Sequence, residues 1–166
     1  MGLAPSLEKV FFAAGGSTYT DYTALARDRD STTHVPLDAM ATTDYLYMGF
    51  SECPRGVYFD IGTNVQGNAA TLDVEFWDGS AWTDVSGDSD GTTSSGATLA
   101  VDGLYTWTLP SSIERAVNGV SGLHWIRFAP SAALSATVDV DEIIPACIDV
   151  NYGYFEAGVE YHYPFD

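Results

Sequence analysis

Residues 71–85 read T-L-D-V-E-F-W-D-G-S-A-W-T-D-V, and this stretch decides the fold class of the chain. From Leu72 to Phe76 every second residue is apolar, which is the period of a strand with one buried and one wet face. The dipeptide Asp78-Gly79 then supplies a tight turn, because both residues tolerate a positive φ. A second strand over 81–85 returns alongside the first. The stretch therefore predicts an antiparallel β-hairpin.

Similar strand patterns recur on both sides of this hairpin, separated by turn residues. We expect further strands at 45–50, 56–61, 97–101, 104–109, 124–128 and 136–144. A single helical turn is expected at 22–27, and a short helix at 110–117 that ends at Asn118-Gly119. Long amphipathic helices are missing between the strands, so the pattern favours an all-β antiparallel β-sandwich of jelly-roll type. The predicted core comprises Leu72, Val74, Phe76, Leu109, Ile126, Phe128, Val138 and Val140.

Three zones are expected along the chain. Residues 1–43 contain Gly, Thr, Asp and Ser clusters with little sustained periodicity, and we interpret them as an extended N-terminal arm. Residues 44–146 form the sandwich. Residues 147–166 form an aromatic-rich C-terminal arm.

Composition excludes several functions. The 166 residues include 23 acidic and 6 basic side chains, for a net charge of -17. A surface of this charge repels a phosphate backbone and anionic lipids, so neither nucleic acid nor a membrane is an expected partner. The acidity fits solubility, a salty environment or docking onto a basic surface. The N-terminus lacks the basic stretch and apolar core of a secretory signal, so synthesis in the cytoplasm is expected.

Catalytic, cofactor and metal motifs are not found, and we expect no enzyme and no cofactor. Asp139 and Asp141 share a strand face, and glycosidases use paired carboxylates, but a solvated acidic face explains the pair equally well. Residues 86–91 resemble the start of a calcium loop. Position 97, where the bidentate glutamate belongs, is alanine, which favours a flexible hairpin tip.

The four tryptophans leave sugar binding open. A β-sandwich that carries Trp77, Trp82, Trp107 and Trp125 is superficially similar to a carbohydrate-binding module. Tryptophans at this spacing are otherwise core residues or hairpin pairs.

The two cysteines, Cys53 and Cys147, are also open to two interpretations. They are either free thiols or one disulfide that joins the start and the end of the folded core. A reducing cytosol favours free thiols.

Six motifs between Tyr45 and Ile144 carry a resemblance to a known family. They are Y-x-G-F at 47–50, G-x-Y-F-D-I-G at 56–62, E-F-W-D-G-S-A-W-T at 75–83, W-T-x-P at 107–110, N-G-x-x-G-x-x-W-I-R at 118–127 and S-A-x-L-S-A-T at 131–137. Together they resemble a β-sandwich module of tailed-bacteriophage virion structural proteins. The resemblance covers the sandwich and leaves both predicted arms outside.

This resemblance implies a sandwich displayed on a virus particle, most like a capsid decoration (cement) protein. Such a protein binds the major capsid protein and sister copies, for example as a homotrimer, and stabilises the shell from the capsid exterior. The alternative is a glycan- or receptor-binding module of a phage tail or capsid surface. The chain shows no repeats or heptads of the kind expected in a fibre.

The C-terminal arm supplies the candidate partner-binding residues. Alternating aromatic residues indicate extended pieces, each with one aromatic face, that can add to the sheet edge of a neighbour. The intrachain core is the other place where these rings can be buried. The candidate residues are Tyr152, Tyr154, Phe155, Tyr161, Tyr163 and Phe165.

Overall fold

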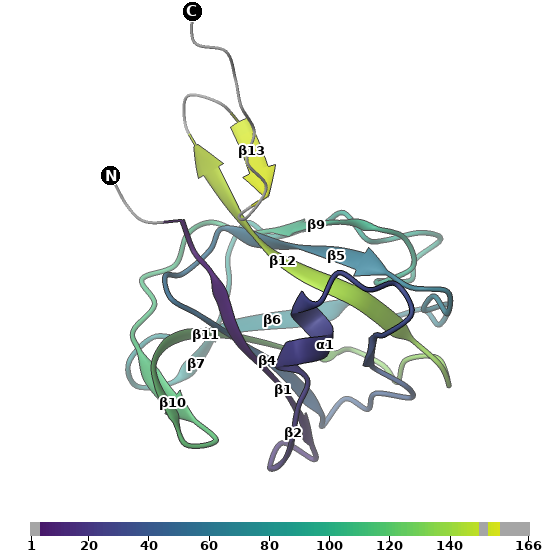
Figure 1. Ribbon diagram of the computed structural model, residues 1–166, viewed down its shortest axis with the longest axis horizontal. Coiled ribbons are helices and arrows are strands. Elements are labelled where there is room, and N and C mark those ends of the chain that lie inside the picture. The colour runs from purple at the N-terminus through teal and green to yellow at the C-terminus, as the bar shows by residue number, and fades with distance from the viewer. Residues whose placement is uncertain (1–3, 150–152, 157–166) are drawn as a thin grey trace, which may run out of the picture.

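The computed structural model describes residues 4–149 and 153–156, with side chains described through Ala146. The described residues form two antiparallel sheets that pack face to face (Figure 1). Sheet A has the order β2 (Thr18–Asp21), β1 (Leu7–Ala14), β4 (Tyr45–Phe50), β11 (Val120–Pro130), β6 (Leu72–Trp77) and β7 (Trp82–Asp84), with β10 (Arg115–Val117) paired to β11. Sheet B has the order β13 (Gly153–Glu156), β12 (Asp139–Asp149), β5 (Gly56–Ile61), β9 (Gly103–Thr106) and β8 (Ser89–Asp90), with β3 (Val35–Pro36) paired to β12.

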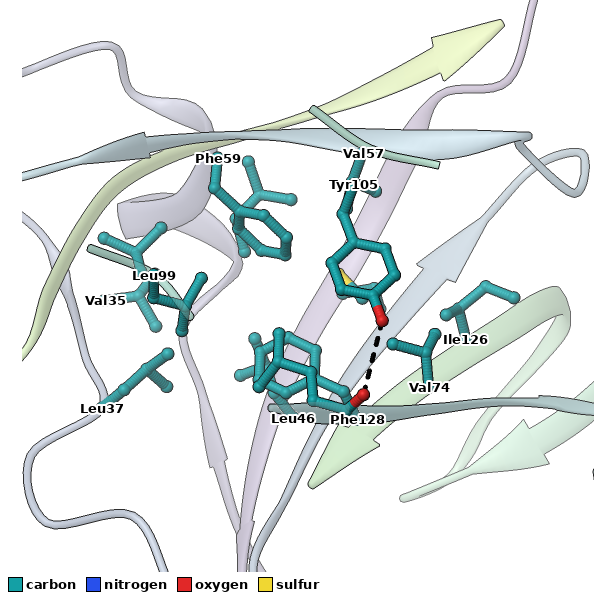
Figure 2. Close-up of a cluster of buried hydrophobic side chains, with 14 of the residues drawn as sticks. Val35, Leu37, Leu46, Val57, Phe59, Val74, Leu99, Tyr105, Ile126 and Phe128 are labelled. Carbon is teal, nitrogen blue, oxygen red and sulfur yellow. Dashed lines mark hydrogen bonds between the residues drawn. The ribbon is translucent and has the colours of Figure 1, made fainter. Parts of the chain in front are cut away.

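The main core fills the space between the sheets. Phe59 of sheet B meets Phe128 of sheet A edge to face, with ring centroids 5.9 Å apart. Tyr105 reaches across the core, and its hydroxyl oxygen lies 3.3 Å from the Leu72 carbonyl oxygen (Figure 2). Of the eight predicted core residues, six are buried: Leu72, Val74, Ile126, Phe128, Val138 and Val140. Phe76 is partly buried against the same core.

The hairpin predicted from residues 71–85 is confirmed. Trp77 pairs with Trp82 across β6 and β7. Gly79 has a φ of +105°, a conformation that favours glycine, which explains its place in the turn. The Asp78 carboxylate accepts hydrogen bonds from the backbone N–H groups of Ser80 and Ala81, each at 2.8 Å.

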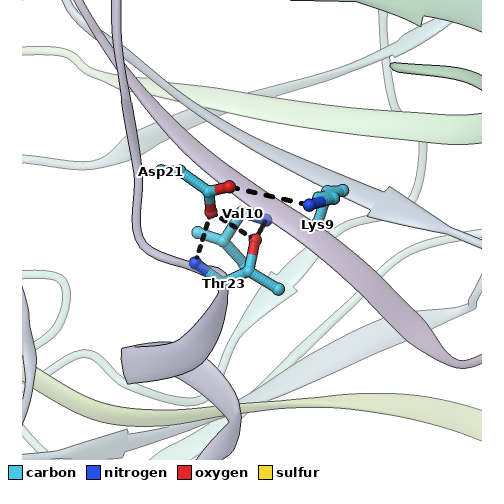
Figure 3. Close-up of polar contacts among 4 residues, drawn as sticks. All are labelled: Lys9, Val10, Asp21 and Thr23. Carbon is cyan, nitrogen blue, oxygen red and sulfur yellow. Dashed lines mark hydrogen bonds and ion pairs between the residues drawn. The ribbon is translucent and has the colours of Figure 1, made fainter.

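The N-terminal residues differ from the extended arm expected over 1–43. Strand β1 lies inside sheet A between β2 and β4, and it buries Leu7 and Val10 in the main core. The expected helical turn is present as α1 (Thr23–Arg27). The Thr23 hydroxyl accepts a hydrogen bond from the Val10 N–H at 2.9 Å and donates to Asp21 at 2.6 Å, which ties α1 to β1 (Figure 3). These pairings are long-range, so local sequence periodicity did not reveal them.

The strand expected at 97–101 is wrong. These residues form turns, and Leu99 adopts a φ of +53°. Side chains take part in the hydrogen bonds here. The Leu99 N–H donates to the Thr92 hydroxyl at 2.8 Å, and the Thr98 hydroxyl donates to the Asp90 carboxylate at 2.6 Å. A buried polar cluster therefore replaces the ladder of a strand.

The helix expected at 110–117 is also wrong. Residues 110–114 have no regular secondary structure, and the end of the segment pairs with β11 as β10. Asn118 and Gly119 have φ values of +47° and +78°, so they form a hairpin turn instead of a helix stop. Leu109, predicted to be in the core, is 44% exposed because Trp107 is the buried residue of this segment.

The last expected strand, 136–144, begins and ends later, as β12 at Asp139–Asp149. Strand β13 folds back on it, and their hairpin projects from the sandwich (Figure 1). The predicted C-terminal arm, 147–166, falls mostly outside the described residues, and so do the side chains of its six aromatic residues. Among the described residues, no helix has the length and apolar character needed to cross a membrane.

Candidate interaction face

The outer face of sheet A, turned away from the main core, carries a layer of aromatic rings. Its strands alternate aliphatic residues toward the core with aromatic residues outward, as at Tyr45 and Tyr47 around Leu46. We call this layer the aromatic face. It comprises Phe11, Tyr19, Tyr45, Tyr47, Trp77, Trp82, Trp125, Arg115 and Arg127.

Trp125 is the centre of this layer and is fully buried in it. Its indole stacks on Phe11, with centroids 5.7 Å apart, and donates to the Arg115 carbonyl at 2.8 Å. The ring covers Gly49, where an added Cβ would lie 2.8 Å from two ring carbons. The layer is therefore a second small core, with the β10–β11 hairpin as part of its cover.

Arg127 lies between two aromatic rings of the face. Its guanidinium carbon is 4.0 Å from the centroid of Tyr45 and 4.3 Å from that of Trp82. The same group donates to Glu75 at 2.6 Å. Burial lowers the pKa of Arg127, but hydrogen bonds to Glu75 and Tyr47 outweigh this effect and raise it. The face thus binds one of the chain's own cations by stacking and by charge.

Arg115 repeats this arrangement at the edge of the sheet. Its guanidinium carbon lies 4.0 Å from the centroid of Trp77, and Trp77 packs edge-on against Trp82 at 5.6 Å. Ile113, which is 52% exposed, lies beside Gly79 in the turn between β6 and β7. The indoles are half-buried and held in fixed orientations, which lowers the entropic cost of contact with a partner.

An acidic groove of about 570 Å³ runs beside the aromatic face. Tyr45 and apolar residues line part of it, together with four carboxylates: Asp73, Glu75, Asp84 and Asp88. Glu75 is engaged by Arg127, and Asp88 accepts a hydrogen bond from Tyr105 at 2.6 Å. Asp73 and Asp84 are exposed, and they leave the groove suited to a cationic or hydroxyl-rich partner.

The carboxylate pair singled out in the sequence lies elsewhere, on sheet B. Asp139 was expected on a solvated face but is buried, and it accepts a hydrogen bond from the Asn64 side chain at 2.6 Å. His34 Nε2 lies 3.1 Å from its other oxygen. Burial raises the pKa of Asp141, and the nearby Asp60 carboxylate raises it further. These contacts give Asp139 a structural role.

The calcium-like segment 86–91 is hydrogen-bonded into the fold and is not a free hairpin tip. Asp88 binds Tyr105, and Asp90 accepts from the Thr92 and Thr98 hydroxyls at 2.6 Å each. Within the described residues, no three His, Cys, Asp or Glu side chains are arranged to hold a metal ion.

The two cysteines approach each other along the backbone. The Arg55 N–H donates to the Ala146 carbonyl at 3.2 Å, so the chain after Cys53 runs beside the chain before Cys147. Cys53 is a free thiol, and burial raises its pKa to about 12. The Cys147 side chain lies outside the described residues.

The four tryptophans are found in the two structural positions predicted for them, the core and a hairpin pair. Trp107 and Trp125 are buried, whereas Trp77 and Trp82 form the expected hairpin pair on a half-exposed face. Arg115 and Arg127 were not among the site residues predicted from the sequence. The alternation of tyrosine with aliphatic residues at 45–48 was the available signal for a sheet with two apolar faces.

The chain was compared with known proteins at three levels. No family model matches it, and neither a curated protein nor a solved structure shows significant similarity.

Proposed function

We propose that this chain is a structural protein of a tailed-bacteriophage virion, a capsid decoration protein that binds the major capsid protein and stabilises the shell. The resemblance of its six motifs to phage virion modules is the source of this proposal. The observation that supports attachment is the edge of the aromatic face, where Trp77 and Trp82 remain partly exposed, together with the acidic groove beside it. A decoration protein prefers the assembled lattice and stabilises it by its free energy of binding, summed over many copies.

We infer that the sandwich is of the jelly-roll type. The chain crosses between the layers at β4, β5 and β6, since β4 lies in sheet A, β5 in sheet B and β6 again in sheet A, whereas hairpins such as β6–β7 and β8–β9 stay within one sheet. As a result, β4, β11 and β6 are neighbours in one sheet, and β5, β9 and β8 are neighbours in the other. Crossing of the chain between two antiparallel sheets supports a double-sheet jelly roll, which is built from Greek-key connections.

The acidic groove and the aromatic face together form the proposed contact with the shell. Aromatic residues act as anchors in interfaces, and exposed carboxylates attract a basic partner surface. Reversing the two exposed groove charges with Asp73→Lys and Asp84→Lys is expected to weaken attachment to undecorated particles by roughly tenfold or more. Co-sedimentation measures this, with Glu52→Lys, an exposed carboxylate on a different loop, as the matched control. Equal binding by the groove variant and the control would remove this face from the proposal.

The C-terminal residues form a second proposed contact, with the capsid or with sister copies. Their aromatic residues, Tyr152, Tyr154, Phe155, Tyr161, Tyr163 and Phe165, serve as anchors there. Deleting residues 152–166 is expected to leave the sandwich folded while attachment is lost. A thermal melt and a co-sedimentation assay on the truncated chain test this. A collapsed melt, or full binding by a folded truncation, contradicts it.

Particle stability and copy number test the role itself. Virions that lack this chain are expected to lose their contents at lower temperature than complete virions. Quantitative mass spectrometry is expected to find hundreds of copies in each particle, as a shell component requires. Three, six or twelve copies would place the chain in a tail or neck instead.

Glycan binding is the second candidate, and the groove is the observation that favours it. An aromatic wall beside carboxylates is a common arrangement for holding a sugar ring and its hydroxyl groups. The stacked Arg127 already covers one face of the Tyr45 and Trp82 rings, which reduces the open stacking surface. Binding to a glycan array that is lost in Tyr45→Ala, with attachment to particles unchanged, would favour this candidate over capsid decoration.

A further inference from the structure

The turn between β10 and β11 consists of an asparagine followed by a glycine. Val117 pairs with Val120, so Asn118 and Gly119 alone connect the two strands. Both turn residues are exposed, and Figure 1 shows the turn projecting from the body of the sheet. An added Cβ at Gly119 would meet no atom within 4 Å. The glycine thus leaves open space around its Cα, which removes the steric hindrance that a larger residue would give to a reaction at its backbone nitrogen.

Asn118 differs from the other asparagines of the described residues in its side-chain contacts. The Asn64 amide donates to the Asp139 carboxylate at 2.6 Å, and the Asn68 amide donates to the Ala133 carbonyl at 3.1 Å. Within the described part of the chain, no hydrogen bond holds the Asn118 amide. The other two asparagines are also followed by a residue that carries a side chain. Of the three, only Asn118 combines an unheld amide with a following glycine.

The aspartate-glycine pairs of the chain are held in place by hydrogen bonds. Asp78 accepts from two backbone N–H groups of its own turn, and Asp90 accepts from two threonine hydroxyls. Asp102 accepts from the Ile61 N–H at 2.8 Å. A carboxylate engaged in this way is not free to turn toward the backbone nitrogen of the next residue. Among these pairs, Asn118 therefore has the side chain that is free to react with its neighbour.

We propose that Asn118 deamidates without an enzyme, through a cyclic imide formed with Gly119, and that the isoaspartate product loosens the β10–β11 cover of the aromatic face. The Gly119 nitrogen attacks Cγ of Asn118 and forms a bond to it. The bond from Cγ to Nδ2 breaks, and Nδ2 leaves as ammonia with the proton given up by the Gly119 nitrogen. Water then opens the imide. Attack at Cγ gives aspartate, and attack at the main-chain carbonyl carbon gives isoaspartate.

The isoaspartate product does not fit a two-residue turn. It places one additional carbon atom in the main chain at position 118, where the Val117–Val120 pair leaves room for two ordinary residues. Val117 is buried in the small core around Trp125, and the Arg115 carbonyl accepts a hydrogen bond from the Trp125 indole at 2.8 Å. Displacement of β10 therefore uncovers Trp125. This inference depends on the turn alone and does not rest on the proposed function.

Peptide mapping during incubation at mildly basic pH tests the site. Tryptic cleavage releases residues 116–127, in which Asn118 is the only asparagine, while Asn64 and Asn68 fall in the peptide 56–115. We expect the amide of Asn118 to be replaced by a carboxyl group at least about tenfold faster than the other two amides, because their hydrogen bonds must first open. Mass spectrometry follows the conversion. Equal rates at the three positions overturn the proposal, and so does an unconverted Asn118 when the isolated peptide 116–127 has fully converted.

Hydrogen exchange tests the consequence for the hairpin. Anion exchange separates the converted chains, and enzymatic methylation measures their isoaspartate content. In chains that carry isoaspartate, the amides of 115–123 are expected to exchange at least about tenfold faster than in fresh protein, while β4 keeps its protection. Unchanged exchange at 115–123 overturns this part of the proposal.

Two variants at position 118 serve as matched controls. Asn118→Gly lacks the amide and keeps a turn that glycine adopts readily, so its exchange is expected to stay unchanged after the same incubation. Fresh Asn118→Asp carries the additional charge without the longer main chain, and it is expected to keep its protection. A loss of protection in either variant equal to that of the isoaspartate form overturns the assignment to main-chain lengthening.

Discussion

Cys53 shows how burial sets the chemistry of a single residue in this fold. Its thiol packs against the main core, and burial raises its pKa to about 12. The reactive thiolate is therefore scarce at neutral pH. In the folded protein, we expect Cys53 to react with an aromatic disulfide reagent at pH 8 about 100-fold more slowly than in the unfolded chain. Peptide mapping after timed labelling separates Cys53 from Cys147, and equal rates in both states would contradict this expectation.

Gly49 is required because of its distance to a neighbouring ring. A Cβ at this position would lie 2.8 Å from Trp125, whose indole is already fixed by Phe11 and the Arg115 carbonyl. Gly49→Ala is expected to lower the free energy of unfolding by about 1–3 kcal/mol, the typical effect of overpacking. Urea denaturation measures it.

Gly67→Ala is the matched control for this substitution. The nearest atom to a Cβ at Gly67 is the Ser135 hydroxyl oxygen at 3.8 Å, an ordinary contact. Its free energy of unfolding is expected to stay within about 0.5 kcal/mol of the parent chain. Equal costs at the two positions would show that the Trp125 ring moves aside freely.

Between elements, Arg127 joins its own strand to three other strands of sheet A. It extends from β11, stacks between Tyr45 of β4 and Trp82 of β7, and binds Glu75 of β6. Arg127→Ala removes both stacking contacts and leaves Glu75 without this charge partner. We expect a loss of about 2 kcal/mol in the free energy of unfolding, because the pair is largely removed from water.

Arg29→Ala serves as its matched control. Arg29 also pairs with a glutamate, Glu142, but its side chain is 60% exposed. An exposed pair is screened by water, so the loss is expected to be at most about 0.5 kcal/mol. Tryptophan fluorescence during urea denaturation measures both variants. A similar loss in each would mean that the stacked position of Arg127 adds nothing to stability.

Across the whole molecule, the large negative charge makes stability depend on pH in two opposite ways. Burial raises the pKa of Asp60, and the Asp102 carboxylate raises it further. Burial raises that of Asp141 as well. The folded state therefore holds these protons more tightly than the unfolded state, and stability should increase as the pH falls from 7 toward the ordinary carboxyl range near 4.

Below that range the sign reverses. Backbone hydrogen bonds from Ala81 and Ser80 hold the pKa of Asp78 well below its ordinary value. As the pH falls, the unfolded chain therefore binds a proton at Asp78 before the folded chain does, and the stability that the Asp78 carboxylate contributes is lost. Melting temperatures between pH 2 and 8 are thus expected to pass through a maximum at mildly acidic pH. Asp60→Asn should raise the melting temperature at pH 7 and flatten the slope between pH 5 and 7. A melting temperature that falls steadily from pH 7 to 5 would contradict this assignment.

Much of the architecture could be predicted from the sequence because strand and turn preferences are local. Alternation over 72–76 and the Asp78-Gly79 turn predicted the β6–β7 hairpin and the buried face that lies on the main core. The same local logic failed at 97–101 and at 110–117. There, a hydrogen bond from the Leu99 N–H to the Thr92 hydroxyl and a left-handed Asn118-Gly119 turn override the apparent pattern.

The all-β class, the central hairpin, most of the core and the acidic charge could be predicted because they depend on neighbouring residues or on composition. The place of β1 inside sheet A and the burial of Asp139 became visible only in the folded chain. Folding also brought Arg127, Tyr45 and Trp82 together. These features depend on pairing between segments far apart in the chain. Their register is set by the packing of both sheets together, which no local period in the sequence records.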